Sequence, residues 1–241
     1  MGTGADYQPW LKKRDVPSQG STSNVRGVRI PRPFHLLSGL EATYFFMLER
    51  RANVTDIREQ FPILDIPGTL NLCSQQNVRH AYKSGYPEPF TIDFLVTELV
   101  DGVEITRAAS IKPANKATNQ RVRARLAIEC DWCHDRTIPW TLVDTSKFTS
   151  TVLDTLRFIR GWFQSGYVPQ PDVEKRFVEI FSQIYRPNNT LLEMLNSVAN
   201  WSNISQTEAQ IIFRYCAWSR SIEIDIERRL DLRGPISLLE A

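Results

Sequence analysis

The sequence has no long apolar run and no excess of charge of one sign, and both absences restrict its function. No stretch of the 241 residues approaches the roughly 20 apolar residues of a membrane-spanning helix. The 29 lysines and arginines nearly balance the 27 aspartates and glutamates, so nucleic-acid binding would need a local basic face. The start, "MGTGADYQPWLKKRD", lacks a hydrophobic signal core, and we therefore expect a cytoplasmic protein without membrane association.

Cysteine is scarce, and the four cysteines make no complete site. "CDWCH", at residues 130–134, has the spacing of a haem-attachment motif, which requires an exported chain, and of half a zinc site, which requires two further ligands. Cys73 and His80 do not have the spacing expected of the two further zinc ligands. We therefore expect reduced thiols. No glycine-rich phosphate loop or nucleophile elbow is present to support other enzyme classes.

Helix and strand patterns alternate along the first part of the chain. Residues 1–33 are rich in Gly, Ser, Pro and charge, and are typical of an extended arm. The following patterns predict a helix, two strand-forming segments, a helix and a strand, in that order, at residues 36–51, 54–66, 91–112, 116–134 and 137–143. This series predicts the α/β class, with a mixed sheet flanked by helices.

The pattern changes around residues 144–150, which predicts a first domain over 1–147 and a second over 148–241. Beyond this point "IEIDIE" alternates as a half-buried strand does. Short helices followed by a β-ribbon are typical of a winged-helix domain, and the same pattern also fits a helical packing or oligomerisation domain. The helical patterns cover 150–164, 171–185 and 190–199, and a fourth begins at Ser205, which forms a capping box with Glu208.

One predicted hairpin brings charged residues together. In "TIDFLVTELVDGVEITRAASIK", Asp101 and Gly102 between two apolar runs are a strong signal for a two-residue turn. That turn places Asp93 opposite Ser110, and Lys112 lies two residues further along on the same face. The hairpin therefore brings a carboxylate, a hydroxyl and an ammonium to its open end, where the proline of "SIKPA" stops the pairing.

The order of these groups has two interpretations. An aspartate beside a lysine is often an ordinary ion pair at the end of a sheet. The order apolar-Asp-apolar, hairpin, then apolar-Lys is also the skeleton of the PD-(D/E)xK nucleases, with Ser110 in place of the second acid. Phosphodiester hydrolysis uses oxygen ligands for Mg²⁺, a positioned water and positive charge near the phosphate. Burial and a nearby cation would depress the pKa of Lys112 and let it act on that water.

A second carboxylate must come from another segment, and Glu41 in "HLLSGLEATYFF" is the candidate. Ser38 and Glu41 have the spacing of a capping box, which would make Glu41 structural. Apolar residues before Ser38 indicate instead that the helix starts earlier, which would place Glu41 in its interior. Both interpretations stay open. For DNA binding the basic candidates are Lys12, Lys13, Lys116, Arg121, Arg123 and Arg125, although runs of this size are often only solvated surface.

Five motifs in order resemble TnsA, the endonuclease subunit of heteromeric cut-and-paste transposases. They are "DYQPWLKKRDVPSQG", "HLLSGLE", "DIREQFPIL", "TIDFLV" and "SIKPA". The segment "SIEIDIERRLDLRGPISL" is more weakly similar to the end of the family's chains. The resemblance implies a restriction-endonuclease-like catalytic domain followed by a winged-helix-like domain.

The resemblance also implies roles for individual residues. Glu41 stands at the first catalytic acid, Asp93 at the metal-binding aspartate and Lys112 at the catalytic lysine. Ser110 departs from the glutamine of a familiar member, which leaves more of the metal ligation to Asp93, Glu41 and the backbone carbonyl of Ile111. Accessory positions near the site or the DNA are Glu129, Glu59 and Gln60.

The implied reaction is Mg²⁺-dependent hydrolysis of the 5′ strands at transposon ends, with two ions per site and Mn²⁺ as a substitute. The implied partners in the bacterial cell are double-stranded DNA, a TnsB-like DDE transposase that cuts and joins the 3′ ends, and a TnsC-like AAA+ ATPase regulator. Two alternatives stay open: a stand-alone restriction or repair nuclease, and a non-catalytic assembly factor that bridges transposase and regulator.

Overall fold

The computed structural model describes residues 2–12, 15 and 23–239. The chain divides into two compact units, one up to Ser146 and the other from Lys147 onward. No helix in these described ranges is both long and apolar enough to cross a membrane.

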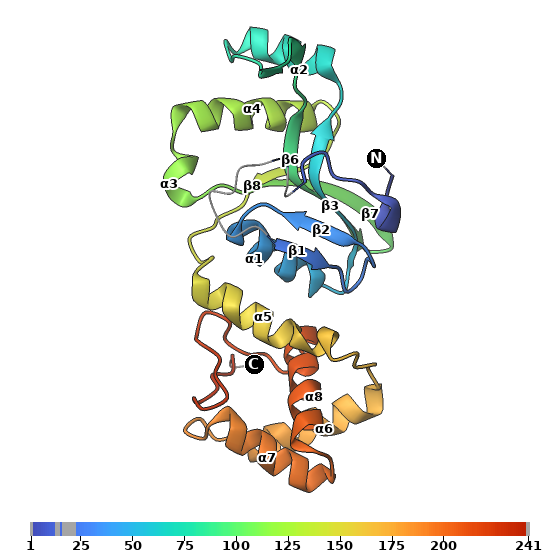
Figure 1. Ribbon diagram of the computed structural model, residues 1–241, viewed down its shortest axis with the longest axis vertical. Coiled ribbons are helices and arrows are strands. Elements are labelled where there is room, and N and C mark those ends of the chain that lie inside the picture. Colours follow the sequence, from blue (N-terminus) through green and yellow to red (C-terminus); the bar gives the residue numbers. More distant parts are fainter. Residues whose placement is uncertain (1, 13–14, 16–22, 240–241) are drawn as a thin grey trace. The chain divides into compact units, whose positions relative to one another are not determined.

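The first unit is built on a four-stranded mixed sheet, as the sequence predicts (Figure 1). The order of the strands is β3-β6-β7-β8, in which the first two pairs are antiparallel and β7 runs parallel to β8. The parallel pair requires a crossover, and the two helices between β7 and β8 supply it. The bounds are β3 Val54–Ile63, β6 Phe90–Val100, β7 Val103–Ser110 and β8 Trp140–Leu142.

The predicted register of the β6–β7 hairpin is confirmed. Val100 pairs with Val103, and the ladder continues to the pair Phe94 and Ala109. The turn residues Asp101 and Gly102 have φ angles of 51° and 79°, the left-handed pair that a tight two-residue hairpin turn requires. Continuing this ladder by one residue places Asp93 opposite Ser110.

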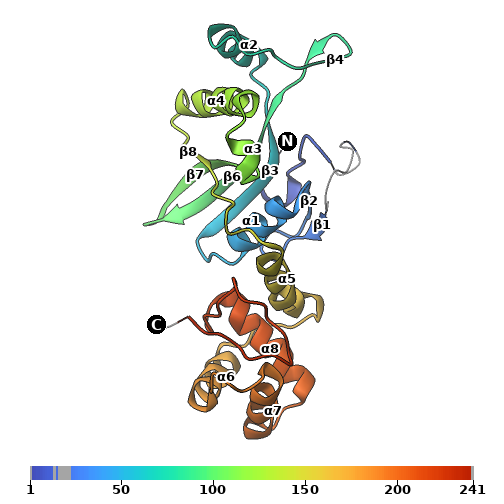
Figure 2. The ribbon, with the colours of Figure 1, turned by 90° about the vertical axis from the view of Figure 1, so that its left-hand side faces the viewer.

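Helices cover both faces of the sheet. Figures 1 and 2 show α4, with α2 beyond it, on one side, and α1 with the short β1–β2 ribbon on the other. On the α4 side Ile128, Trp132 and Cys133 pack with Ile92 and Leu95 of β6 in one buried cluster. The helices are α1 Gly39–Glu49, α2 Ile66–Gln75, α3 Ala114–Ala117 and α4 Gln120–His134.

Part of the predicted N-terminal arm is packed rather than extended. It contains a 3₁₀ turn, η1 Gly4–Asp6, and strand β1 Ser23–Arg26, which pairs with β2 Pro33–Leu36. The side chain of Tyr7 is buried, and its hydroxyl donates a hydrogen bond to the carbonyl of Glu59. A small hairpin, β4 Tyr82–Lys83 and β5 Tyr86–Pro87, completes the unit.

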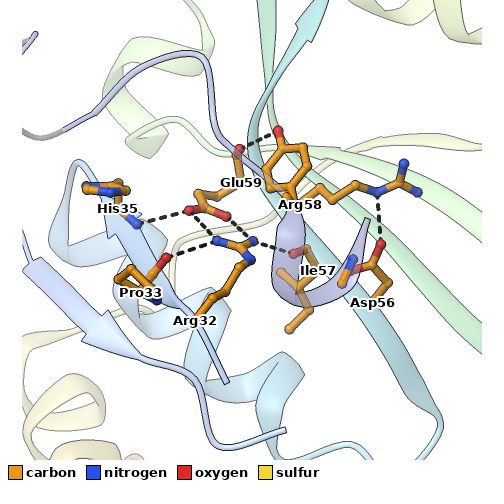
Figure 3. A network of polar contacts seen from close by, with 9 residues as sticks. Arg32, Pro33, His35, Asp56, Ile57, Arg58 and Glu59 are labelled. Carbon is orange, nitrogen blue, oxygen red and sulfur yellow. Dashed lines mark hydrogen bonds and ion pairs between the residues drawn. The ribbon is translucent and has the colours of Figure 1, made fainter. Parts of the chain in front are cut away.

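Arg32 and Glu59 form a buried ion pair that joins this N-terminal segment to β3 (Figure 3). Two guanidinium nitrogens of Arg32 bind the two carboxylate oxygens of Glu59, at 3.0 and 2.6 Å. The guanidinium also donates to the carbonyl of Ile57 and lies 3.7 Å from the ring centre of Phe34. The backbone N–H of His35 donates a further bond to Glu59. Glu59 therefore has a structural role in β3, and its predicted accessory place near the site or the DNA stays a prediction.

The second unit is mainly helical, and its predicted β-ribbon is reduced to a short antiparallel pairing. Residues 223–225 meet residues 237–239 through the bridge between Ile224 and Leu238 and two backbone hydrogen bonds, from Asp225 to Ser237 and from Leu239 to Glu223. The strand predicted for "IEIDIE" is present only as this pairing, and the winged-helix assignment stays a prediction. Thr190 and Glu193 form a full capping box that the sequence reasoning missed. The helices are α5 Ser150–Gln164, α6 Pro171–Ile184, α7 Leu191–Ser202 and α8 Gln206–Ser219.

Candidate active site

Asp93 and Lys112 meet at the open end of the hairpin. The ammonium of Lys112 lies 2.7 Å from Oδ2 of Asp93, and the backbone N–H of Ile111 donates to the same oxygen at 2.6 Å. Asp93 is buried and the Lys112 side chain is 30% exposed, so the pair sits where the sheet end reaches solvent. The hydroxyl of Thr145 donates to the carbonyl of Lys112 and holds the main chain just before Pro113. The predicted convergence of acid and amine is therefore observed.

The protonation of Lys112 differs from the sequence-based expectation. Burial lowers the pKa of Lys112, but the charge of Asp93 and the hydrogen bond to it raise the pKa by more. The net direction is upward, so without metal Lys112 is an ammonium. The expected depression of the Lys112 pKa depends on a bound cation and stays a prediction, whereas in the metal-free site the carboxylate in direct contact with the amine outweighs burial.

Ser110 is linked to Glu129. The Ser110 hydroxyl is fully buried and donates to Oε2 of Glu129 at 2.6 Å, from β7 to α4. Burial, followed by the negative charge of Asp93, raises the pKa of the Glu129 carboxyl to about 7. Serine at position 110 therefore connects the hairpin end to a second buried acid.

Replacement of Glu129 by glutamine should change how stability depends on pH. In metal-free protein the folded state keeps Glu129 protonated up to about pH 7, whereas an unfolded glutamate loses its proton near 4.5. The stability that Glu129 contributes to the folded state is therefore complete below its unfolded pKa of 4.5, and it is lost as pH rises through its folded pKa of about 7. Between pH 4.5 and 8, wild type should lose roughly 3 kcal/mol more stability than Glu129→Gln, measured by urea unfolding with a chelator present.

The matched control for this experiment is Glu104→Gln, at an exposed position on β7. Its free energy of unfolding should run parallel to that of wild type across the same pH range. Parallel curves for wild type and Glu129→Gln would contradict the buried, protonated state of Glu129.

Glu41 lies in the first turn of helix α1 and contacts its N-cap. The helix begins at Gly39, and the hydroxyl of its N-cap Ser38 accepts from the backbone N–H of Glu41, so this half of the predicted capping box is formed and the earlier start is wrong. The Glu41 carboxylate accepts from the backbone N–H of Leu37, from the Ser38 hydroxyl and from the Gln60 amide, at 2.9, 3.0 and 3.2 Å. Burial, followed by the charge of Asp93, raises the pKa of Glu41 to about 7. Structural capping and proximity to Asp93 therefore coexist in one side chain.

Most of the predicted basic residues are available to solvent. Lys12 is half-buried, and Lys13 lies outside the described residues. Arg125 packs over the ring of Phe90, 4.6 Å from its centre, and lies one turn before Glu129 on α4. The exposed set on α3 and α4 is Lys116, Arg121, Arg123 and Arg125.

The donor chemistry of the site suits a hard divalent cation. Glu41, Asp93 and Ile111 offer two carboxylates and a backbone carbonyl, the oxygen ligands that Mg²⁺ prefers. Burial, and after it the charge of Asp93, raises the pKa of both Glu41 and Glu129, so the three acids are close enough to interact electrostatically. Among the described residues, however, no group of three or more His, Cys, Asp or Glu forms a ready-made metal centre.

Residues 51–145 match the family described as "TnsA-like endonuclease N terminal". The chain is also 32% identical over 159 residues to "Transposon Tn7 transposition protein TnsA" of Escherichia coli. The chain contains a TnsA-like domain. Asp93, Ser110, Lys112 and Glu129 all lie within the matched range, whereas Glu41 lies just before it.

The similarity to Tn7 TnsA is partial in length. It covers 66% of this chain and 58% of the relative, so the chain spans somewhat over half the length of that protein. The cysteines within the matched residues are free thiols. Cys133 of the "CDWCH" segment lies on α4 and belongs to the same buried cluster as Ile92 and Leu95 of β6.

Proposed function

We propose that this chain is a metal-dependent DNA endonuclease subunit of a transposase, which hydrolyses the 5′ strands at transposon ends. The observation that carries the proposal is the 2.7 Å contact between Lys112 and Asp93 at the end of the β6–β7 hairpin. The contact unites the acid and the amine of the nuclease skeleton inside a TnsA-like endonuclease domain. The similarity of the chain to Tn7 TnsA supports the transposase context.

Asp93, Glu41 and the carbonyl of Ile111 would hold Mg²⁺, and Mn²⁺ would substitute for it. The bound metal would supply Lewis-acid stabilisation of the phosphate and a water of lowered pKa. Asp93 supports this role because both of its observed hydrogen bonds go to Oδ2, which leaves Oδ1 without a hydrogen bond among the described residues. Ser110 would hold Glu129 beside the ligands through their hydrogen bond.

Lys112 would act as a cation at the scissile phosphate. Its net positive charge, sustained by Asp93, suits the stabilisation of negative charge that develops on the phosphate oxygens. It would also orient the attacking water by donating a hydrogen bond. The carbonyl of Lys112 is fixed by Thr145, which limits the positions that the ammonium can reach.

The exposed basic residues of α3 and α4 would bind the DNA backbone next to this site. Lys116 lies four residues after Lys112, and Arg125 lies one helical turn from Glu129. Phosphate contacts of this kind position a duplex without reading its sequence. The helical second unit would bind a TnsC-like ATPase regulator, DNA, or both, and a TnsB-like transposase would process the 3′ ends.

Lys112→Ala tests the proposal with Lys116→Ala as its matched control. The chain is mixed with its transposase, its ATPase regulator, Mg²⁺ and end-labelled transposon DNA, and each strand is followed on a denaturing gel. Lys112→Ala should reduce 5′-strand cleavage by at least about 100-fold, because charge stabilisation is lost, while 3′-end joining persists. Lys116→Ala removes a proposed phosphate contact instead, so it should raise the DNA concentration needed for half-maximal cleavage while leaving the 5′-cleavage rate at saturating DNA near that of wild type.

Other outcomes identify the alternatives. Cleavage by the chain alone, with its own site preference, would indicate a stand-alone restriction or repair nuclease. Absence of 5′ cleavage by wild type, with normal 3′ joining, would indicate a non-catalytic assembly factor. Equal 5′ cleavage by Lys112→Ala and wild type would refute the role of the lysine.

A further inference from the structure

Gln60 occupies an unusual position in β3. The pairs Glu59–Phe94 and Phe61–Ile92 flank it, so Gln60 stands opposite Asp93 in the ladder. Its φ is 48°, a left-handed backbone in the middle of a strand, which is uncommon for a residue other than glycine. Such strain persists only where the surroundings impose it, and it concentrates at functional sites.

The N-terminal segment holds this strained backbone. The backbone N–H of Trp10 donates to the carbonyl of Gln60 at 3.2 Å. One residue earlier, the carbonyl of Glu59 accepts from the hydroxyl of Tyr7 at 3.0 Å, and the Glu59 side chain is locked by Arg32. The backbone carbonyls of Glu59 and Gln60 are therefore both held by hydrogen bonds from the N-terminal segment.

The strained backbone orients the Gln60 side chain toward Glu41. Gln60 is only 2% exposed, and its amide Nε2 donates to Oε2 of Glu41 at 3.2 Å. An amide holds the carboxylate in place while adding no charge. An arginine or lysine in the same place would neutralise Glu41 and compete with a metal ion for it.

We propose that Gln60 is a positioning residue that fixes the Glu41 carboxylate for a divalent cation, and that the segment Tyr7–Trp10 maintains the left-handed backbone on which this depends. The inference rests on the proposed nuclease function and extends it. Residues that orient metal ligands typically change metal affinity or activity by about 10- to 100-fold when removed.

Two replacements of Gln60 separate the amide from the backbone. Gln60→Gly deletes the amide but adopts a φ of 48° without strain, whereas Gln60→Ala deletes the amide and keeps the strain. Asn77→Gly is the matched control, because Asn77 is also left-handed, at φ 54°, but is exposed at the end of α2. Mn²⁺ affinity is measured by calorimetry on the full chain, and the Mg²⁺ concentration for half-maximal cleavage is measured in the reconstituted reaction.

Both Gln60 variants should bind Mn²⁺ about 10- to 100-fold more weakly, and their half-maximal Mg²⁺ concentration should rise by a similar factor. Gln60→Gly should unfold at or above the wild-type temperature, so that the weaker binding cannot reflect unfolding. Wild-type Mn²⁺ affinity in Gln60→Gly, or equal loss in Asn77→Gly, would overturn the inference and leave the proposed function standing. A wild-type chain that neither binds Mn²⁺ nor cleaves DNA would overturn both.

Discussion

Asp93→Asn should abolish 5′-strand cleavage at transposon ends. The substitution keeps the size of the side chain but removes the negative charge that binds the metal and that pairs with Lys112 at 2.7 Å. Several kcal/mol of transition-state stabilisation then disappear, which corresponds to a loss of roughly three orders of magnitude in rate. The rate is measured by single-turnover cleavage of end-labelled DNA with the transposase and the regulator present.

Asp101→Asn is the matched control for this loss. Asp101 lies on the same hairpin, at the turn rather than at the open end, and asparagine readily adopts its left-handed φ of 51°. It should cleave at nearly the wild-type rate, and both variants should leave 3′-end joining intact. Cleavage by Asp93→Asn at the wild-type rate would show that the Asp93 carboxylate takes no part in the reaction.

Arg32→Met should lower the free energy of unfolding of the first unit more than any surface substitution. The side chains of Arg32 and Glu59 are 4% and 0% exposed, so the pair is fully removed from water. Methionine leaves the Glu59 carboxylate buried and without its cation, retaining the N–H of His35 as a donor. The expected cost is about 3–5 kcal/mol in the free energy of unfolding. It is measured by urea-dependent hydrogen exchange of the β3 amides, which separates this unit from the other.

Two comparisons make the Arg32 prediction specific. Arg157→Met breaks an exposed pair with Asp154 on α5 and, followed through the α5 amides of the second unit, should cost less than about 1 kcal/mol. The double variant Arg32→Met with Glu59→Met should recover much of the loss, because no charge then remains buried. A single Arg32 variant as mild as Arg157→Met would show that the buried pair does not hold β1, β2 and β3 together.

The hairpin and its charged end could be predicted from the sequence because their determinants are local. Asp101 and Gly102 fix the turn, the turn fixes the register, and the register places Asp93 near Lys112. Pro113 then ends the strand, and the next helix begins at Ala114. A register set by two adjacent residues needs no knowledge of the rest of the fold.

The support of the site could not be predicted in the same way because it depends on distant segments. The Arg32–Glu59 pair joins residues far apart in the chain, and Gln60 owes its left-handed backbone to Trp10. No local pattern indicates that the Glu59 carboxylate binds Arg32 while the Gln60 amide binds Glu41. Adjacent residues of a strand generally point to opposite faces, and this rule could have separated the two.

Helix α2 and the second unit show two further limits. The start of α2 has a readable signal, because Asp65 caps the helix and Pro67 lies in its first turn. The strand predicted over residues 54–66 nevertheless runs past this signal. In the second unit "IEIDIE" has the period of a strand, but a strand also requires a partner. Residues 223–225 pair with 237–239 over this short stretch, through the Ile224–Leu238 bridge and the backbone hydrogen bonds from Asp225 to Ser237 and from Leu239 to Glu223.

The most direct test of the active site is the position of a bound metal. Crystals of the chain with Mn²⁺ should give an anomalous-scattering peak within coordination distance of an Asp93 carboxylate oxygen and the Ile111 carbonyl, and Asp93→Asn should remove it. A wild-type crystal at saturating Mn²⁺ without this peak, with Lys112 still bound to Asp93, would contradict the assignment and leave the pair an ordinary ion pair at a sheet end.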